Sequence, residues 1–466
     1  MPDHTRPSYS LTIRLSIERK PGMLGRITTT IGQRGGLMGT ITIVSLERGR
    51  ILRDLNVYAR DEDHEQRIVE GLKGIPGVQV LTVKDRTFDY HEGGKIRVES
   101  RREIEGPDDL AIAYTPGVGR ISLAVADDAE RAHKYTMKGN SVAVVTDGTA
   151  VLGLGNIGPM GALPVMEGKA VLFRKFAGIN AFPICLNVTD PDTIVSVVKA
   201  ISPAFGGINL EDISAPRCFE IERRLTEELD IPVFDDDQHG TAIAVLAALY
   251  NALLLVKKQL NEAKIVISGI GAAGIACVKI LRAAGATDIT ACDRKGMIYP
   301  GREEGMNPVK EELARLINPQ GKKGGLKEAL DGADVFIGVS SGDILAPSDL
   351  SIMAHEPIVF ALANPIPEVD PEGAKDYASI VATGRSDFPN QISNVLVFPG
   401  MFRGALDARA RRITTAMNLA AARAIAGLVP LDELSEGYIV PTAFHTEVSR
   451  TVAQAVAAAA NESGAV

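Results

Sequence analysis

Five carboxylates in two short stretches are the residues whose types and spacing could do chemistry. NLEDIS holds Glu211 and Asp212, and VFDDDQHGT holds Asp235, Asp236 and Asp237. Neighbouring like charges repel, and each costs free energy if it leaves water unpaired. The aspartates could cap the helix that follows them, or both groups together could bind a cation. Oxygen ligands without a thiolate or imidazole cluster suit Mg²⁺ or Mn²⁺, and the sequence favours this second interpretation.

Both acidic stretches follow short apolar segments, and one helical segment (PRCFEIERRLTEEL) lies between them. This alternation predicts parallel strands covered by helices, whose carboxyl ends meet at one ligand-binding edge of the sheet. His239 follows the three aspartates. A lone histidine at a helix start is more often a cap or a donor to a ligand than a ligand itself.

A glycine fingerprint, GxGxxG, occurs twice. The copy at 153–158 precedes PMGALPVMEG, where we expect no crossover helix, and KAVLF, where we expect a strand. The copy at 269–274 follows the strand KIVIS and opens the helix IACVKILRAAG. Asp293 ends the next strand. The second copy therefore predicts a Rossmann-type dinucleotide site, and the first is interpreted as a decoy.

The second fingerprint assigns a role to each position. Gly269 makes the tight turn, Gly271 lets the backbone approach the pyrophosphate, and Gly274 lets the helix pack on the strand. Ala272 and Ala273 open the helix, whose N-terminus attracts phosphate. An acid at the end of the next strand accepts hydrogen bonds from the ribose and favours NAD. The two cations that follow it leave NADP open. These three residues are Asp293, Arg294 and Lys295.

The chain has 466 residues, enough for two or three domains, and an α/β fold class is expected beyond a charged linker at about 84–106. Residues 1–86 show a β-α-β-β-α-β order with alternating apolar positions, which predicts a ferredoxin-like sheet. This segment resembles an ACT domain at the PGxLxxI motif (21–27) and at the glycines 35–36. The resemblance implies a small effector site or a dimerisation platform.

The bulk composition argues against several classes of protein. A net charge of −8 argues against nucleic-acid and anionic-membrane binding. The four cysteines are scattered, and the polar N-terminus shows no signal peptide. The apolar run at 241–256 is too short to span a bilayer. We therefore expect a cytoplasmic enzyme.

From residue 114 onward the chain resembles malic enzymes of the shorter bacterial type. Eight blocks match in the family's order: AYTPGV at 113–118, DGTAVLGLG at 147–155, GKA at 168–170, NLED at 209–212, FDDDQHGT at 234–241, GIGAAG at 269–274, FALANP at 360–365 and NVLVFP at 394–399. The resemblance implies a substrate and metal domain at 87–250 and a Rossmann-type NAD-binding domain at 251–466. It also implies oxidative decarboxylation of L-malate to pyruvate with NAD or NADP.

The resemblance also assigns residue roles. The metal ligands are Glu211, Asp212 and Asp237, which would hold the cation that chelates malate. Asp236 would support them or orient the base. Lys169 would be the general base, whose pKa must be lowered, and Tyr114 would be the acid that protonates C3. The amides of Asn364 and Asn394 would contact substrate or nicotinamide.

One position departs from the larger malic enzymes, which carry a substrate-binding arginine after the Asp-Gly pair. Here Thr149 and Ala150 follow that pair. Arg174 and Lys175 are the candidate replacements, from the same subunit or from a neighbouring one.

Three other functions stay open. A malolactic-type enzyme would return the hydride and release lactate, a ligand sensor would keep the scaffold without turnover, and a plain hydroxyacid dehydrogenase would leave the acidic cluster idle. We also expect at least a homodimer and a small effector at the ACT-like segment.

Overall fold

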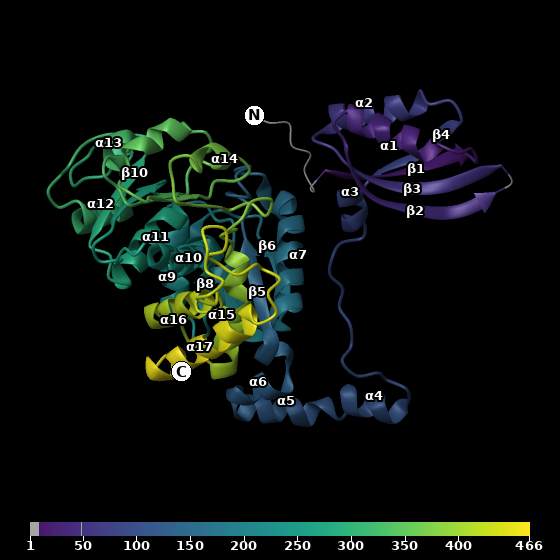
Figure 1. Ribbon diagram of the computed structural model, residues 1–466. Coiled ribbons are helices and arrows are strands. Elements are labelled where there is room, and N and C mark those ends of the chain that lie inside the picture. Colours follow the sequence, from purple (N-terminus) through teal and green to yellow (C-terminus); the bar gives the residue numbers. More distant parts are fainter. Residues whose placement is uncertain (1–8, 48) are drawn as a thin grey trace. The chain divides into compact units, whose positions relative to one another are not determined.

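The computed structural model describes residues 9–47 and 49–466, and the chain forms two compact units, Met1–Val98 and Glu99–Val466 (Figure 1). Each unit has its own hydrophobic core. The boundary at Val98 lies in the charged segment after α3 (Arg86–His91), a helix that contacts β1 and β4 of the first unit. The expected linker thus begins with a short helix.

Unit 1 is a four-stranded antiparallel sheet covered on one face by two helices. Its strand order is β2-β3-β1-β4. Side chains alternate along β1, so Leu11, Ile13, Leu15 and Ile17 enter the core with residues from both helices. The elements are β1 (Ser10–Glu18), α1 (Met23–Gln33), β2 (Leu37–Glu47), β3 (Arg50–Tyr58), α2 (Glu62–Lys73) and β4 (Val78–Asp85).

Unit 2 contains two sheets. The smaller is fully parallel, with strand order β6-β5-β7-β8, so β7 and β8 are neighbours and end at the same edge. Its strands are buried or half-buried along their whole length, as expected for a sheet covered on both faces. The elements are β5 (Ser141–Thr146), α7 (Gly158–Ala177), β6 (Asn180–Cys185), α8 (Pro191–Ile201), β7 (Gly207–Leu210), α9 (Arg217–Glu228) and β8 (Val233–Asp235).

The larger sheet has the strand order β11-β10-β9-β12-β13-β14, and only the short edge strand β11 is antiparallel. Strand order reverses at β9, which is the expected Rossmann-type arrangement with its ligand site at the switch point. The strands are β9 (Lys264–Ser268), β10 (Asp288–Asp293), β11 (Gly296–Met297), β12 (Val335–Gly338), β13 (Ile358–Ala361) and β14 (Ile380–Thr383). The helices are α11 (Ala272–Ala283), α12 (Pro308–Ile317), α13 (Leu326–Leu330) and α14 (Pro371–Ala374).

One core joins the two sheets of unit 2 around α10 (Thr241–Leu255). This helix is buried on nearly every side and packs against α11 and α16 (Thr415–Ala426). Helices α15 (Phe398–Ala408) and α17 (Val448–Glu462) complete the layer. The expected boundary at residue 250 falls inside α10, so the two predicted domains share this helix.

Among the described residues one helical segment, Asp236–Leu255, is long and apolar enough to cross a membrane. It exceeds the expected length because a π-helical turn, Asp236–Gly240, precedes α10. Its most apolar window is 72% buried inside the protein, which is typical of a core helix.

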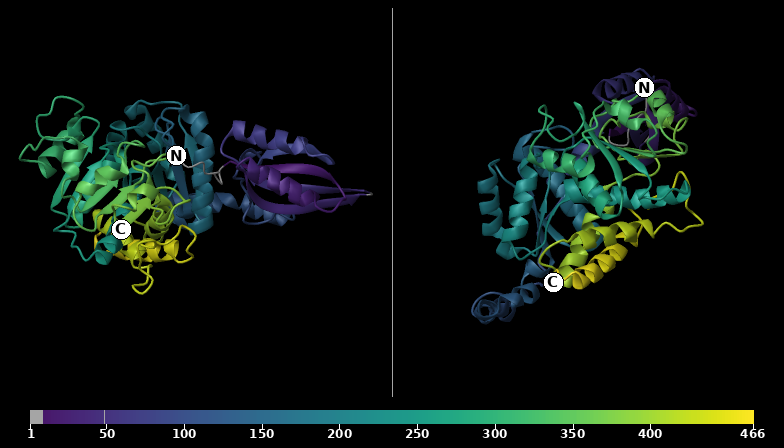
Figure 2. Two further views of the ribbon diagram at one scale, coloured as in Figure 1. Left: turned by 45° about the horizontal axis from the view of Figure 1, so that its top comes forward. Right: turned by 90° about the vertical axis from the view of Figure 1, so that its left-hand side faces the viewer.

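An arm of short helices precedes β5. It comprises α4 (Pro107–Ala113), α5 (Val118–Asp127) and α6 (Ala132–Tyr135), and every residue of these helices is exposed or half-buried. Helices α4 and α5 extend away from the body of unit 2, as Figures 1 and 2 show. Their principal contacts are with each other and with the turn Ala129–Arg131.

Two sequence-based expectations about the first glycine fingerprint were wrong. Residues 158–177 form the 20-residue helix α7, which includes both the PMGALPVMEG segment and the supposed strand KAVLF. The buried residues Ala162, Met166, Lys169 and Phe173 recur at three- and four-residue spacing, which is a helical period. The two prolines and the short apolar run concealed that period.

Candidate active site

The two acidic stretches come together at the carboxyl edge of the smaller sheet. Leu210 and Asp235 pair across β7 and β8, so the residues that follow each strand are adjacent. Glu211, Asp212 and Asp237 each present a carboxylate oxygen within 4.8 Å of the other two. The backbone N–H of Asp212 donates to Asp237 Oδ2 at 2.6 Å, and Asn209 Nδ2 donates to Glu211 Oε2 at 2.9 Å.

The donor set fits a divalent cation. Glu211 and Asp212 are buried, and Oδ2 of Asp212 is a buried atom without a hydrogen-bond partner among the described residues. An unpartnered buried carboxylate oxygen is costly, and a bound cation would satisfy it. Three hard oxygen ligands match the preference of Mg²⁺ and Mn²⁺.

The three consecutive aspartates have separate surroundings. Asp235 caps the π-helical turn by accepting from the Gln238 N–H at 3.2 Å and from Gln238 Nε2 at 2.6 Å. Asp237 directs its carboxylate towards Glu211 and Asp212. His239 Nε2 lies 2.8 Å from Glu222 Oε1, which makes it a structural partner of that glutamate. The capping and cation interpretations therefore apply to different aspartates.

Asp236 is fully buried and connects the acidic edge to two other elements. Its Oδ2 accepts from Asn394 Nδ2 at 2.6 Å and forms an ion pair with Lys169. It fits only because residue 240 is glycine, since a Cβ there would lie 1.9 Å from Asp236 Oδ1. Asp236 thus positions a lysine and an amide beside the carboxylate cluster.

Lys169 is buried on α7, and its Nζ lies 2.9 Å from Glu211 Oε1 and 4.2 Å from the centroid of the Phe398 ring. Burial by itself lowers the pKa of Lys169, but the charges of Asp236 and Glu211 outweigh it and raise the pKa above its usual value. This direction is opposite to the one expected for a base, because two carboxylates contact the ammonium.

The carboxylates show the converse effect. Burial, with repulsion from Glu211, raises the pKa of Asp212 to about 7. Burial raises the pKa of Asp236 to about 7 as well, although Lys169 opposes the shift. Burial and the charges of Glu211, Asp235 and Asp212 raise the pKa of Asp237 well above its usual value. Placing these like charges close together costs free energy, and such a cluster of raised pKa values is typical of a functional site.

Within the described residues, two expected site residues make no hydrogen bond to the carboxylate cluster. Asn364 is exposed in the loop after β13, where its backbone oxygen would lie 2.8 Å from a Cβ at Gly153, so this loop packs against the segment after β5. Tyr114 caps the C-terminus of α4 on the arm and is 65% exposed. The structure does not bring Tyr114 to Lys169 within one chain.

Neither proposed substitute for the missing arginine lies at the cluster. Arg174 and Lys175 are exposed in the last turn of α7, where Arg174 donates to Gly178 O at 3.1 Å. Arg217, which sequence reasoning missed, sends its guanidinium into the DGTA segment. Its Nη2 donates to Thr149 Oγ1 at 2.9 Å, and its Nη1 lies 3.0 Å from Asp147 Oδ2.

Arg217 also donates to Ser214 Oγ at 2.9 Å and to Thr189 O, so it joins three loops. One of those loops carries Asp212, whose backbone oxygen accepts from the Ala150 N–H at 2.9 Å. The guanidinium therefore braces the loop of a candidate metal ligand. The only sequence signal was its place as the fourth residue of SAPRCFE, after the acidic stretch.

The second glycine fingerprint has the geometry expected of it. Gly269 has φ +100°, and a Cβ there would lie 2.4 Å from Val339 O. A Cβ at Gly274 would lie 1.8 Å from Gly269 O, so helix and strand pack directly. A Cβ at Gly271 would meet nothing within 4 Å, which leaves room for a ligand at the N-terminus of α11.

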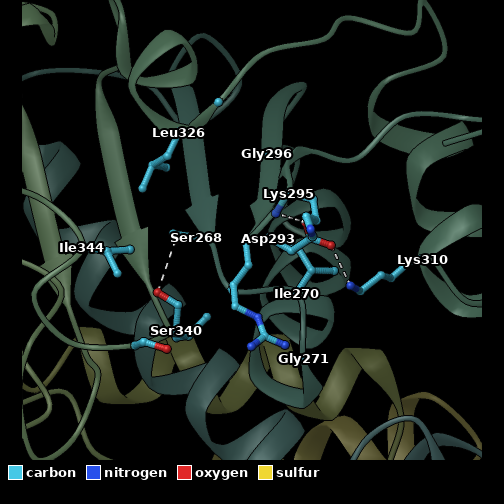
Figure 3. A pocket seen from close by; sticks show the side chains of 15 residues that line it. Ser268, Ile270, Gly271, Asp293, Lys295, Gly296, Lys310, Leu326, Ser340 and Ile344 are labelled. Carbon is cyan, nitrogen blue, oxygen red and sulfur yellow. Dashed lines mark hydrogen bonds and ion pairs between the residues drawn. The ribbon is translucent and has the colours of Figure 1, made fainter. Parts of the chain in front are cut away.

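A pocket of about 780 Å³ opens above this turn, with Asp293, Lys295 and Lys310 on one side and Leu326 and Ile344 on the other (Figure 3). It is large enough for part of a dinucleotide. Gly271 lines the pocket, and the backbone of Ala272 and Ala273 begins α11 directly after it.

Asp293 is more heavily paired than its sequence position suggested. Its Oδ2 accepts from Arg302 and, at 2.7 Å, from Lys310 Nζ, and its Oδ1 accepts from the Lys295 N–H at 2.9 Å. Burial tends to raise the pKa of Asp293, but the bonds from Arg302 and Lys310 outweigh it and lower the pKa. Arg294 and Lys295 are exposed at the rim.

Comparison with known proteins is consistent with this geometry. The family model for the malic enzyme N-terminal domain matches residues 93–226, and the model for the malic enzyme NAD binding domain matches residues 238–461. The chain is 56% identical to the NAD-dependent malic enzyme of Geobacillus stearothermophilus, over 98% of this chain and 95% of that one. It is also 56% identical to the bifunctional malic/malolactic enzyme of Bacillus subtilis, over 82% and 94%.

Solved structures agree. The NAD-dependent malic enzyme of Thermotoga maritima superposes with a TM-score of 0.77 at 50% identity, and covers 79% of this chain and 98% of its own. The malic enzyme of Pyrococcus horikoshii gives a TM-score of 0.79 at 46% identity, over 82% and 91%. The chain belongs to the malic enzyme family.

Proposed function

We propose that this protein oxidises L-malate and decarboxylates it to pyruvate and CO₂, with NAD as the hydride acceptor. The observation that carries the proposal is the group of buried and half-buried side chains formed by Lys169, Asp236 and the three carboxylates, at one edge of the sheet that adjoins a dinucleotide turn. The 56% identity to an NAD-dependent malic enzyme over nearly the whole chain supports it.

Glu211, Asp212 and Asp237 would hold Mg²⁺ or Mn²⁺. When bound, the cation supplies positive charge beside the C2 oxygen of malate and offsets the negative charge that develops there. Asp236 and Asn209 hold the surrounding hydrogen bonds, which fix the orientation of Lys169, Asn394 and Glu211.

Lys169 must be neutral to act as the base, and the positive charge of a bound cation would oppose its protonation. In that form Lys169 Nζ takes the proton of the C2 hydroxyl while the C2 hydride passes to the nicotinamide ring. The C3–C4 bond then breaks, CO₂ leaves, and the Tyr114 hydroxyl returns a proton to C3. Asn364 and Asn394 orient substrate and nicotinamide with their amides. Gly269, Gly271 and Gly274, with the N-terminus of α11, seat the pyrophosphate.

The test is a paired assay of NADH formation and pyruvate formation from L-malate, with and without Mn²⁺. Equal, metal-dependent yields of both products are expected. NADH without pyruvate, or turnover indifferent to a chelator, would instead indicate a plain dehydrogenase.

A malolactic reaction is the second candidate, and the name of the Bacillus subtilis relative favours testing it. Lactate formed from malate without net NADH would establish that outcome. NADP replaces NAD in the same assay to compare the two cofactors.

We further propose that residues 1–86 form an ACT-like regulatory domain, followed by a substrate and metal domain (87–250) and a dinucleotide domain (251–466). The β-α-β-β-α-β order of unit 1 supports the first assignment, as does Gly22, which takes φ +83° at the turn before α1. A groove of about 510 Å³ between Arg26, Thr29 and Thr30 of α1 and residues 74–76 is the candidate effector site. A cytoplasmic homo-oligomer completes the proposal.

The regulatory assignment predicts that a small ligand changes malate turnover only when unit 1 is present. Single L-amino acids are the probes, added to the full chain and to a chain that lacks residues 1–86. Because unit 1 has a separate core, removing it should leave basal turnover intact. A ligand that acts equally on both chains would contradict the assignment.

A further inference from the structure

We propose that Glu368 is a positioning residue for the proposed reaction, because its carboxylate ties the loop that borders the dinucleotide pocket to the loop that carries Asn364. The first loop, residues 339–345, follows β12, and the second, residues 362–367, follows β13. The inference rests on the proposed function, in which Asn364 orients substrate and nicotinamide. Glu368 would act through these two loops and not by touching a ligand.

Glu368 is a fully buried carboxylate. Within residues 9–47 and 49–466 it forms no ion pair, and its hydrogen-bond donors are neutral groups. It packs so closely on the end of β12 that a Cβ at Gly338 would lie 2.4 Å from Glu368 Cδ. Burial raises the pKa of Glu368 above its usual value, although the bonds from Ser340 and Ala363 oppose the shift. A buried carboxylate without a cation costs free energy, so the bonds that it accepts are what explains it.

One carboxylate oxygen holds the edge of the dinucleotide pocket. The Ser340 N–H donates to Glu368 Oε1 at 2.7 Å, and Ser340 Oγ donates to the same oxygen at 3.1 Å. Ser340 Oγ also lies 3.3 Å from Ser268 Oγ at the end of β9 (Figure 3). Both serines line the pocket. Oε1 therefore fixes the part of the pocket edge that these two serines form.

The other oxygen holds the loop of Asn364. The Ala363 N–H donates to Oε2 at 3.0 Å, and Ala363 directly precedes Asn364. The backbone oxygen of Glu368 accepts from the Ile344 N–H at 2.9 Å, which joins the two loops again. The Asn364 amide lies beside the segment after β14, where a Cβ at Gly384 would lie 2.9 Å from Asn364 Nδ2. The place of this amide thus depends on a bond one residue away.

Only a carboxylate can serve both loops. Each loop presents a backbone N–H to Glu368, and an ionised carboxylate offers an acceptor oxygen to each of them. A glutamine has one acceptor oxygen and could satisfy one loop, whereas a methionine of similar length would satisfy neither. Loss of the carboxylate should therefore release the two loops from one another.

The test is Glu368→Met in the full chain, assayed with L-malate, NAD and Mn²⁺. The kcat should fall about tenfold, because the Asn364 amide loses its fixed place. The affinity for Mn²⁺, measured by calorimetry, should be unchanged, since other elements build the carboxylate cluster, and this result also shows that the variant is folded. An unchanged kcat would overturn the proposal.

Glu372→Met is the matched control. This glutamate lies four residues further along the chain, its side chain is 56% exposed, and it pairs with Lys375 at the surface. The substitution removes the same charge from the same segment without releasing either loop, so the kcat should stay at the wild-type value. An equal fall in kcat in the two variants would overturn the proposal.

A double-variant comparison separates the positioning of Asn364 from a general effect on stability. In an Asn364→Ala background the amide is already gone, so adding Glu368→Met should lower the kcat by less than about twofold. An equal loss in both backgrounds would overturn the proposal, because Glu368 would then affect turnover by a route that does not include Asn364.

Titration with NADH in the absence of malate distinguishes failure of this proposal from failure of the proposed function. Glu368→Met should weaken NADH binding, measured by fluorescence, about fivefold, because nothing then holds the Ser340 edge of the pocket. Ser340→Ala keeps the carboxylate and loses only the hydroxyl bond, so it should weaken binding about twofold and serves even if Glu368→Met does not fold. Unchanged NADH affinity in both variants would overturn the proposal, whether or not malate is the substrate. Weaker NADH binding in both, with no malate turnover by the wild-type chain, would overturn the proposed function and leave Glu368 its place at the pocket edge.

Discussion

The two candidate ligand sites of unit 2 are built in opposite ways. The dinucleotide turn is local: β9, three glycines and the start of α11 lie within a few residues of one another, and the nearest atoms to Gly269 and Gly274 are backbone atoms. The carboxylate site is assembled from β7, the π-helical turn, α7 and the segment at Asn394, and it depends on buried charges. Single side chains should therefore matter far more at the second site than at the first.

The largest effect is expected at Lys169. Lys169→Met removes the only ammonium that contacts Glu211 and Asp236 in the described structure and takes away the proposed base. Malate oxidation should fall on the order of a thousandfold, within the range that general-base loss produces. NAD affinity, measured by fluorescence titration without malate, should be unchanged. Equal losses of NAD affinity and turnover would mean that the two sites are not separately built.

Asp237→Asn comes next. It replaces one of three clustered carboxylate oxygens, so the affinity for Mn²⁺ measured by calorimetry should fall on the order of 100-fold. Asp235→Asn is the matched comparison, because Asp235 caps the turn and does not face the cluster. Similar losses in the two variants would show that the turn as a whole, and not Asp237, sets the affinity.

At the dinucleotide turn we expect the backbone, and not a side chain, to determine NAD binding. Gly271→Val places a side chain where none now lies within 4 Å, so the fold should persist while the pyrophosphate is excluded. The KM for NAD should rise about tenfold or more, with the affinity for Mn²⁺ unchanged. Gly32→Ala, on α1 with equally open surroundings, is the control. An unaltered KM would place the pyrophosphate elsewhere.

The smallest effect on ligand affinity or turnover is expected at Arg217, where folding stability changes instead. Arg217→Met leaves Asp147, whose side chain is buried, without its cation, and should lower the free energy of unfolding by about 2 kcal/mol. This is less than for a fully buried pair because Arg217 is 25% exposed. Denaturant unfolding measures it, and adding Asp147→Asn should recover part of the loss. If the double variant were less stable than the single one, the brace would not depend on this pair.

The sequence was informative where an interaction is local and less so where it is not. The β9–α11 turn follows from glycine stereochemistry and strand–helix order, and the adjacency of Glu211, Asp212 and Asp237 follows from the parallel sheet. Helix α7 was missed because its prolines mask a helical period. The partners of Asp293 lie 9 and 17 residues further on, outside the fingerprint.

Arg217 and Tyr114 show the limit of motif reasoning in another way. Arg217 reaches Thr149 across 68 residues of sequence, so no spacing rule indicates it. Tyr114 matches its motif, yet the motif carries no information on where the helical arm places it.

The π-helical turn ahead of α10 has a consequence for how this segment can change over time. Because α10 is buried on nearly every side, its rotation about its own axis is fixed by packing against α11 and α16. Adding or removing one residue between Asp237 and Thr241 would turn the carboxylates by about 100° relative to that helix. Substitutions in this stretch can be compensated by their neighbours, but a change in its length cannot, so insertions and deletions should be absent from it in any descendant that keeps the cation site.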